Sequence, residues 1–518
     1  MIRLSTSFVI IICISSLAQL LGSNAAYAAD STPTTLLATP TIWRVTTETL
    51  SLPNAEKMGM VSGDLLFDVN DHLRLGAGTY GAIRGNRGGF ITLGMEAEAY
   101  HHFAPSWTGH SGLFVGAGGG RGGLQLAGGG LMLRGDVGLT YITQDYGNLG
   151  FGISHVTFPS GVISSTQPYL QYEYMFKSLM TPGWDFTPRV AVHSHALSTI
   201  EPHASEFALV HLAYKIPRSA VSAAGQPQAS SMQLLGAEWT AYLSEDWFIK
   251  LHSAGAMGGQ NNGYMQILAG GGYRLPLASG TSVKFDAGVG PAGGGNVDTG
   301  GGLLVNGNIA LQQTLGSNLA VEMSLGEMRA PTRSYRARSL GVKLAYLFDL
   351  PGPRTDWIDI ADLAGYDSNR LRVRAANQTY FKAAPKWRNQ FVDKPVSNLG
   401  VQFDYFVTPR WFATAQGLAA YAGSAGAFMT GMVGMGMHQE ISEHVFTEGE
   451  VLFGSAGGGG LEVGGGLVGQ FNASLGYQLT APLALSASIG RIKSATGAFQ
   501  ANVLGVGLSY KLTNFNKR

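Results

Sequence analysis

Residues 470–479 read QFNASLGYQL, a stretch in which apolar and polar side chains alternate without interruption. The apolar positions are Phe471, Ala473, Leu475, Tyr477 and Leu479. Because successive side chains of a β-strand point to opposite faces, this pattern predicts a strand with one apolar and one polar face. Its length is also close to the roughly 9–11 residues with which a tilted strand crosses a bilayer.

The same alternation recurs along the chain, at 131–141, 319–325, 483–489 and 504–512. A soluble β-sandwich also alternates, so the pattern alone leaves two fold classes open. The bilayer-crossing length and the small polar side chains of the opposite face favour an all-β fold, a transmembrane antiparallel β-barrel.

The N-terminal residues have the composition of a secretory signal peptide. Arg3 gives the positive start, residues 8–21 the apolar run and Ala26-Tyr27-Ala28 a cleavage site. The only cysteine, Cys13, lies inside this signal, so the mature chain is expected to have no disulfide and no Cys-based metal site. No later segment approaches the roughly 20 continuous apolar residues of a membrane helix.

Composition narrows the class further. The formal net charge is +1, and charged residues make up 13% of the chain, about half of the usual share. Glycine supplies 74 of the 518 residues, about twice its usual share. This balance argues against nucleic-acid binding, and it suits an outer-membrane barrel, whose lipid face is apolar although no segment is continuously so.

The chain contains an internal repeat. Residues 235–348 and 399–512 align without a gap at a constant offset of 164, and AGGG at 292–295 meets AGGG at 456–459. A more diverged copy lies upstream, around residues 117–141. The protein is therefore one module used three times.

Each repeat contains about seven alternating segments, and the parity of membrane crossings requires an eighth. Residues 41–52 and 371–381 alternate well enough to supply it, whereas the second connection offers two candidates, 186–194 and 206–216. The expected organisation is a signal peptide (1–28), repeat 1 (41–176), a connecting segment with extra strands (177–230), repeat 2 (231–349), a linker (350–370), repeat 3 (371–512) and a C-terminal tail (513–518).

The turns differ on the two sides of the predicted sheet. Those at 244–246 and 408–410 are short, whereas those at 292–302 and 456–466 are Gly-rich hairpins. Short turns lie on the periplasmic side of outer-membrane barrels, so we expect the Gly-rich hairpins outside the cell. They lack the G-x-x-x-x-G-K-[ST] pattern and join two strands, which excludes a phosphate-binding loop.

The closing strand adds a resemblance. Gly507-Leu508-Ser509-Tyr510-Lys511-Leu512 resembles the C-terminal assembly signal of outer-membrane barrel proteins, with Leu512 in place of the usual terminal aromatic residue and six residues after it. At class level the chain resembles a Gram-negative outer-membrane β-barrel protein. The resemblance implies location in the bacterial outer membrane, contact with outer-membrane lipid and lipopolysaccharide, and insertion by the barrel assembly machinery.

Two closures fit the repeats. One is a single barrel of about 24 strands, and the other is three tandem barrels of eight strands, each able to close around its own side chains. We favour the single barrel, because the many inward Gly, Ala and Ser residues leave room for a lumen. Its pore-lining residues would be Arg134, Asp136, Lys284, Asp286, Asn308, Glu322, Glu448, Glu450, Asn472 and Lys511. In narrow barrels the same side chains would bond one another and fill the interior.

Other candidate sites are weaker. His193 and Ser194 are adjacent, as in outer-membrane lipid hydrolases, but no third group is fixed by the sequence to orient the histidine. The histidines are too scattered for a metal site. Arg336 and Arg338 continue a lipid-facing register toward the outer end, where they either meet lipopolysaccharide phosphates or simply extend to the interface.

These observations predict an outer-membrane channel or translocation pore for a small solute or a secreted polymer, without catalysis and without a cofactor. A periplasmic export or uptake partner would fit this function. The alternative is a structural or surface-interaction protein with no open pore, which the three-barrel closure would favour. A lipid hydrolase at the barrel rim is a third hypothesis, and it depends on His193 and Ser194 alone.

Overall fold

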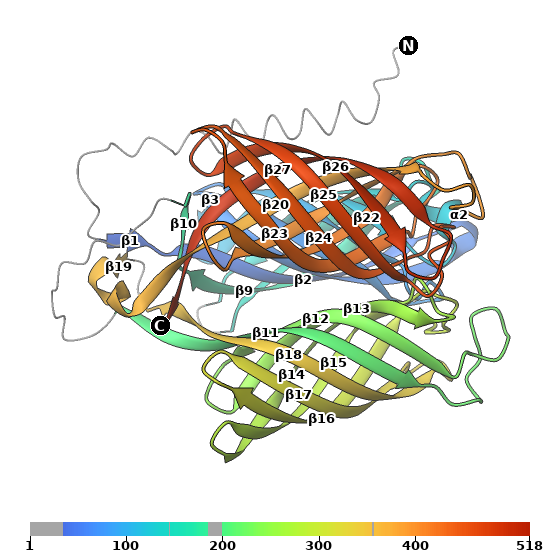
Figure 1. Ribbon diagram of the computed structural model, residues 1–518, viewed down its shortest axis with the longest axis horizontal. Helices are drawn as coiled ribbons and strands as arrows, with labels where there is room; N and C mark the ends of the chain where they lie inside the picture. The colour runs from blue at the N-terminus through green and yellow to red at the C-terminus, as the bar shows by residue number, and fades with distance from the viewer. Residues whose placement is uncertain (1–34, 144–145, 185–198, 355–356, 518) are drawn as a thin grey trace, which may run out of the picture.

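The computed structural model describes residues 35–143, 146–184, 199–354 and 357–517. Within them the chain forms three closed antiparallel barrels of eight strands each (Figure 1). The predicted signal peptide and residues 186–194 lie outside the described residues. Among the described residues, no helix is both long enough and apolar enough to cross a bilayer.

The strands of each barrel follow in chain order. Barrel 1 consists of β2 (Thr39–Ser51), β3 (Lys57–Asn70), β4 (Leu73–Arg84), β5 (Ile91–Ala104), β6 (Trp107–Gly119), β7 (Leu131–Tyr141), β8 (Asn148–Thr157) and β9 (Ser164–Ser178). Barrel 2 consists of β11 (Ile200–Lys215), β12 (Ser231–Tyr242), β13 (Trp247–Gly259), β14 (Met265–Ala278), β15 (Thr281–Gly293), β16 (Leu303–Leu315), β17 (Leu319–Arg329) and β18 (Arg336–Pro353). Barrel 3 consists of β20 (Tyr366–Lys382), β21 (Val396–Phe406), β22 (Trp411–Ala422), β23 (Met429–Glu440), β24 (Val445–Gly457), β25 (Leu467–Gln478), β26 (Leu483–Ser494) and β27 (Gln500–Lys517).

Short elements lie outside the barrels or in their loops. They are β1 (Thr35–Leu37), β10 (Met180–Pro182), β19 (Trp357–Asp359), the 3-10 helices η1 (Pro53–Ala55) and η2 (Ile360–Gly365), and the one-turn helix α2 (Gly123–Ala127).

The expectation of one barrel with about 24 strands is wrong, and the three-barrel alternative is confirmed. The first strand of each repeat pairs with the eighth strand of the same repeat, β2 with β9, β11 with β18 and β20 with β27. Several predicted boundaries also change. β11 lies in the segment 177–230, which was expected to be a connection with extra strands, and it belongs to barrel 2. β20 begins inside the predicted linker, and β27 continues through most of the predicted tail.

The inward glycines explain why the sequence wrongly suggested one wide barrel with a lumen. A Cβ at Gly272 would lie 2.6 Å from the ring of Phe248, and one at Gly436 would lie 2.2 Å from the ring of Phe412. These are equivalent positions of barrels 2 and 3. The glycines therefore leave space for large side chains from a neighbouring strand, and the interior is filled rather than open.

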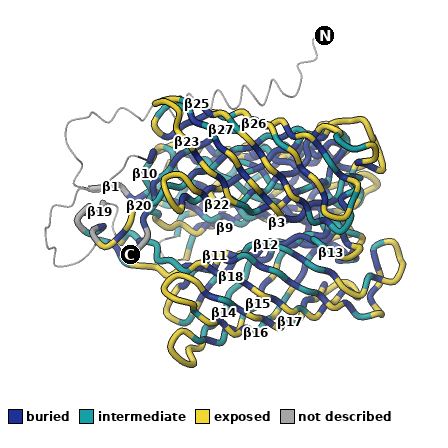
Figure 2. The backbone as a smooth tube through the Cα atoms, viewed as in Figure 1, coloured by how far each residue is buried: buried dark blue, intermediate teal, exposed yellow. Residues whose placement is uncertain are grey.

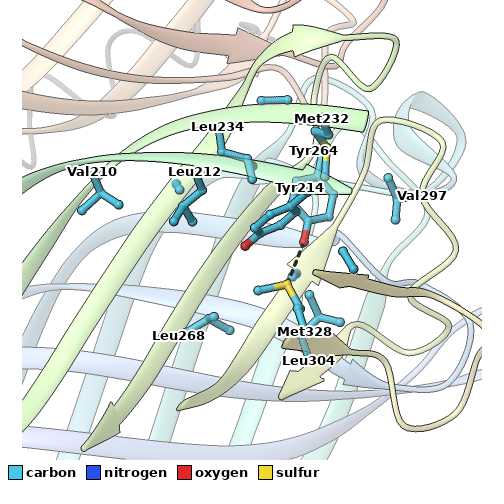
Figure 3. Close-up of a cluster of buried hydrophobic side chains, with 14 of the residues drawn as sticks. Val210, Leu212, Tyr214, Met232, Leu234, Tyr264, Leu268, Val297, Leu304 and Met328 are labelled. Atoms are coloured by element: carbon cyan, nitrogen blue, oxygen red, sulfur yellow. Dashed lines mark hydrogen bonds between the residues drawn. The ribbon is translucent and has the colours of Figure 1, made fainter. Parts of the chain in front are cut away.

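The interior of each barrel is apolar toward the Gly-rich end. In barrel 2, Val210, Leu212, Tyr214, Tyr264 and Met328 belong to one buried cluster (Figure 3). Similar clusters occupy barrels 1 and 3. The expected polar interior is thus only part of the interior, and an apolar plug closes the rest.

The outer surface of the barrels follows the alternation. Buried and exposed residues alternate along the strands in Figure 2. In β25 the outward side chains Phe471, Leu475 and Tyr477 are exposed, whereas Gln470 and Asn472 are buried. The predicted assignment of inward and outward faces is confirmed for this strand.

The three barrels form a closed ring. The third strand of one barrel packs against the fifth and sixth strands of the next: β4 against β15 and β16, β13 against β24 and β25, and β22 against β6 and β7. Each contact uses one surface of one barrel and a different surface of its neighbour, and three such heterologous contacts return to the start.

The Gly-rich hairpins make the ring tight. Gly88 N donates to Gly300 O at 2.8 Å between barrels 1 and 2, and Gly426 N donates to Gly128 O at 3.1 Å between barrels 3 and 1. Gly89 has φ +81°, and a Cβ there would lie 2.2 Å from the backbone N of Gly294. Only glycine allows backbones of neighbouring barrels to approach this closely.

At the opposite end, connecting segments join the barrels. β1 pairs with β19, and β10, from the connection between barrels 1 and 2, pairs with β27 of barrel 3. Trp184 follows β10 and packs inside the mouth of barrel 3, with its Nε1 donating to Leu371 O at 3.0 Å and its ring 4.6 Å from that of Phe406.

Candidate functional site

The polar part of each barrel interior is an ion-pair network. In barrel 3, Arg372 contacts Asp404 at 2.8 Å and Glu448 at 2.5 Å. Arg374 contacts Asp404 at 2.7 Å and also Glu450. Arg372 and Asp404 are both fully buried. Charges this deep are stable only when paired and hydrogen-bonded, which this arrangement provides.

The other two barrels are built alike with different residues. In barrel 2, Lys284 contacts Glu206 at 2.8 Å and Glu322 at 3.3 Å, and Glu322 also contacts Lys343 at 2.7 Å. In barrel 1, Arg134 contacts Glu48 at 3.1 Å and also Asp136. These networks cross the interior from strand to strand.

All ten predicted pore-lining residues lie on the inward face, but in three separate interiors. Arg134 and Asp136 are in barrel 1; Lys284, Asp286, Asn308 and Glu322 are in barrel 2; and Glu448, Glu450, Asn472 and Lys511 are in barrel 3. Each has a polar partner: Asp286 contacts Lys250 at 2.5 Å, Asn308 donates to Asp286 at 2.7 Å, Asn472 donates to Glu450 at 3.4 Å, and Lys511 donates to Gln478. The shared pore that they were expected to line does not exist, because the repeats close separately.

A large cavity lies between the barrels. Its volume is about 4330 Å³, and most of its lining residues point outward from the three barrels, although the inward residues Asp64, Lys250 and Asp404 also border it. We call it the central chamber. Its wall is mainly aliphatic and aromatic, so its chemistry is the reverse of the barrel interiors.

The chamber wall repeats with the three modules. Met95, Ala269 and Val433 occupy equivalent outward positions on the fourth strand of each barrel, and all three line the chamber. Tyr174, Tyr346 and Tyr510 do the same on the eighth strand. One pattern of outward residues therefore builds one wall from three sides.

Aromatic residues gather in the half of the chamber away from the Gly-rich hairpins. Phe207 and Trp239 of barrel 2, paired across β11 and β12, and Phe403 of barrel 3 line this half. The rings of Tyr346 and Tyr405 approach to 6.5 Å between barrels 2 and 3. Aromatic side chains with a polar edge are typical of the interface between bilayer and water.

The sequence analysis missed the chamber, because a residue facing it and a residue facing lipid have the same pattern. Leu508 was expected to face lipid, and it does point outward, yet it lies on the chamber wall and is only 7% exposed. The one available signal was the threefold repeat itself, since three closed modules in one chain can pack around a common space.

The other sequence hypotheses are little changed by the structure. His193 and Ser194 lie outside the described residues, so the hydrolase hypothesis stays untested. In the described part of the chain, no group of three or more His, Cys, Asp or Glu side chains could hold a metal ion. Arg336 and Arg338 lie on the outward face of β18, both exposed, in register with Leu340 and Val342.

At class level the geometry is that of an outer-membrane β-barrel protein: antiparallel, closed, and apolar on its outer face. No family model and no curated protein matches the sequence.

Solved structures that resemble the chain include the ferric enterobactin receptor PfeA, OpdQ and the siderophore receptor PirA. The ferric enterobactin receptor PfeA of Pseudomonas aeruginosa is 9% identical over 93% of this chain and 82% of that one, with a TM-score of 0.27. OpdQ of the same organism is 12% identical over 92% of this chain and 98% of that one, with a TM-score of 0.21. The siderophore receptor PirA of Acinetobacter baumannii is 8% identical over 93% and 81%, with a TM-score of 0.27. At these scores the resemblance carries no argument about the function of this chain.

Proposed function

We propose that this protein is an outer-membrane carrier or conduit for an apolar solute, which it holds in the central chamber between its three barrels. The observation that carries the proposal is the apolar wall of a cavity of about 4330 Å³. The Gly-rich hairpins face outward and the aromatic half of the chamber faces the periplasm in this proposal.

The barrel interiors support the proposal, because we expect no solute to pass through them. Each contains a buried ion-pair network and, toward the Gly-rich end, an apolar plug. An ion entering one of them would have to break buried pairs, and breaking one such pair costs about 3–5 kcal/mol. Passage through the protein is therefore easiest between the barrels.

The chemistry of the wall selects the cargo. Water inside an apolar cavity lacks the two to four polar partners that hold a buried water. A hydrocarbon chain loses nothing by entering, and each CH₂ that it removes from water contributes about 0.8 kcal/mol. The chamber thus favours aliphatic or aromatic molecules over ions and sugars.

The test compares uptake of the hydrophobic dye N-phenyl-1-naphthylamine by cells that carry the native protein or a variant with a filled chamber. We expect Ala269→Trp combined with Val433→Trp to slow dye uptake severalfold, because both positions face the chamber. The matched control is Ala473→Trp, an exposed outward position of β25 that is not on the chamber wall. Equal uptake by the filled variant and the control would contradict the proposal.

The second candidate is a structural outer-membrane protein without an open path, which the filled barrel interiors favour. Planar-bilayer recordings do not separate the two, since both predict almost no ionic conductance. Dye uptake does, because a purely structural protein would leave it at the level of cells lacking the protein.

A further inference from the structure

A cluster of cations lies on the outward face of barrel 2, at its Gly-rich end. Lys215 on β11, Arg329 on β17, and Arg336 and Arg338 on β18 are all exposed. We call these four residues the basic patch. It is independent of the central chamber, because none of the four lines that cavity.

The register of the strands sets like charges opposite one another. Lys215 is the direct neighbour of Arg338, and Arg329 is the direct neighbour of Arg336. Like charges at directly opposite positions of an antiparallel pair repel and destabilise it. Two such unfavourable pairs occur on three adjacent strands. A bound anion would offset their repulsion.

The chain itself supplies little counter-charge. In the part that the structure describes, none of the four side chains makes an ion pair, although Glu327 is the cross-strand neighbour of Arg338. The interior of the same barrel differs, since Lys250, Lys284 and Lys343 each contact two carboxylates. The patch is therefore left with unused positive charge at the surface.

The patch also lies at the edge of the lipid-facing surface. Arg336 and Arg338 continue the outward register of Leu340 and Val342, which are 47% and 42% exposed and do not line the chamber. A charge in this register is tolerated only at the bilayer interface, where phosphate groups of lipids are found. Guanidinium groups bind phosphate oxygens in bidentate fashion, which suits three arginines on neighbouring strands.

The patch belongs to barrel 2 and not to the module. The equivalents of Arg329, Arg336 and Arg338 in barrel 1 are Thr157, Ser164 and Thr166. In barrel 3 they are Lys493, Gln500 and Asn502. Barrels 1 and 3 fold without a cation at the equivalents of Arg336 and Arg338, so the fold does not explain the presence of these two arginines.

We propose that the basic patch binds the phosphate groups of a lipopolysaccharide-class glycolipid in the outer leaflet. Its four cations fit a lipid that carries more than one phosphate better than a phospholipid with one. The glycolipid would lie against the outer side of barrel 2 and bridge β11, β17 and β18 near their outer ends.

The test uses the full chain in detergent and measures bound lipopolysaccharide by native mass spectrometry after mixing. We expect the Arg336→Gln, Arg338→Gln double variant to bind roughly tenfold more weakly, because each interfacial cation contributes to the attraction. The charge-matched control is Arg218→Gln with Lys386→Gln, two exposed loop cations at the same end. Retained heat-modifiable migration on gels shows that both variants are folded.

Three results would overturn the proposal. The first is equal binding by the double variant and the native chain, and the second is an equal loss in the charge-matched control. The third is full competition by millimolar inorganic phosphate, which would indicate a site for a free anion. Enzymatically dephosphorylated lipopolysaccharide is expected to bind as weakly to the native chain as intact lipopolysaccharide binds to the double variant.

Discussion

The interior of each barrel and the space between the barrels have opposite chemistry. Inside barrel 3, Arg372 and Arg374 form a buried network with carboxylates, whereas in the central chamber Val433 and Met435 of the same barrel present an apolar wall. Charge is thus enclosed where eight strands close tightly, and the roomy space is left apolar. The difference teaches that the larger opening of a multi-barrel protein need not lie inside any barrel.

The most severe way to separate the two regions is to remove two barrels. We expect residues 366–518, expressed behind a signal peptide, to fold into a heat-modifiable eight-stranded barrel, because β20 closes on β27 within this fragment. The chamber would be lost while the interior network remained. Heat-modifiable migration and resistance to protease would check this, and aggregation of the fragment would show that the ring is needed for closure.

Breaking the interior network should have the next largest effect. Arg372→Ala leaves Asp404 and Glu448 buried with one cation fewer, so we expect a loss of about 3–5 kcal/mol in the free energy of unfolding. Denaturant unfolding of the protein in detergent would measure it. Arg410→Ala, in an exposed short turn, is the control, with an expected change within about 0.5 kcal/mol.

A charge on the chamber wall tests what fills the chamber. Met435 lines the chamber and Met323 faces lipid on β17, and they are 56% and 58% exposed. If hydrocarbon fills the chamber, Met435→Arg and Met323→Arg should each cost about 2–4 kcal/mol. Folding yields in vesicles would be compared. Tolerance of Met435→Arg alone would mean that the chamber is wet.

The smallest effect is expected at the mouth of barrel 3. Trp184→Ala removes a ring that packs on Phe406 and lies 4.1 Å from Lys511 Nζ, which should cost about 1–2 kcal/mol. Conductance in a planar bilayer should stay at background, because the apolar plug at the Gly-rich end remains. Discrete conductance steps in this variant would show that the interior is open once Trp184 is gone.

The sequence alone was sufficient for the strands, because alternation is local. It predicted β2 and β20 from parity and identified the inward residues of β25 correctly. Closure was beyond it, since whether β11 pairs with β18 or with a strand of barrel 1 depends on contacts more than a hundred residues apart. The inward glycines could also mean either an open lumen or a filled interior. The space beside Gly436 is filled by the ring of Phe412, which lies on a different strand, so the sequence of one strand does not show that it is filled.

The candidate site was predictable only in part. The ten inward polar residues were found by register, but their partners were not, because equivalent positions in the repeats carry different charges. Lys284 of barrel 2 corresponds to Glu448 of barrel 3, whereas the neighbouring pair, Asp286 and Glu450, carries the same charge in both barrels. The acidic and basic side chains pair differently in each barrel, and their spacing in the sequence does not reveal which of them are partners.

The closed ring of three barrels has a further consequence, which follows from its being one polypeptide. Three separate copies would assemble only above some concentration, whereas covalent linkage makes each docking step intramolecular. A homotrimer would also carry every substitution three times around its axis. In a single chain, each barrel can change independently of the other two. Barrel 2 can therefore carry arginines where barrel 1 has threonine and serine, and three similar barrels can form an asymmetric surface.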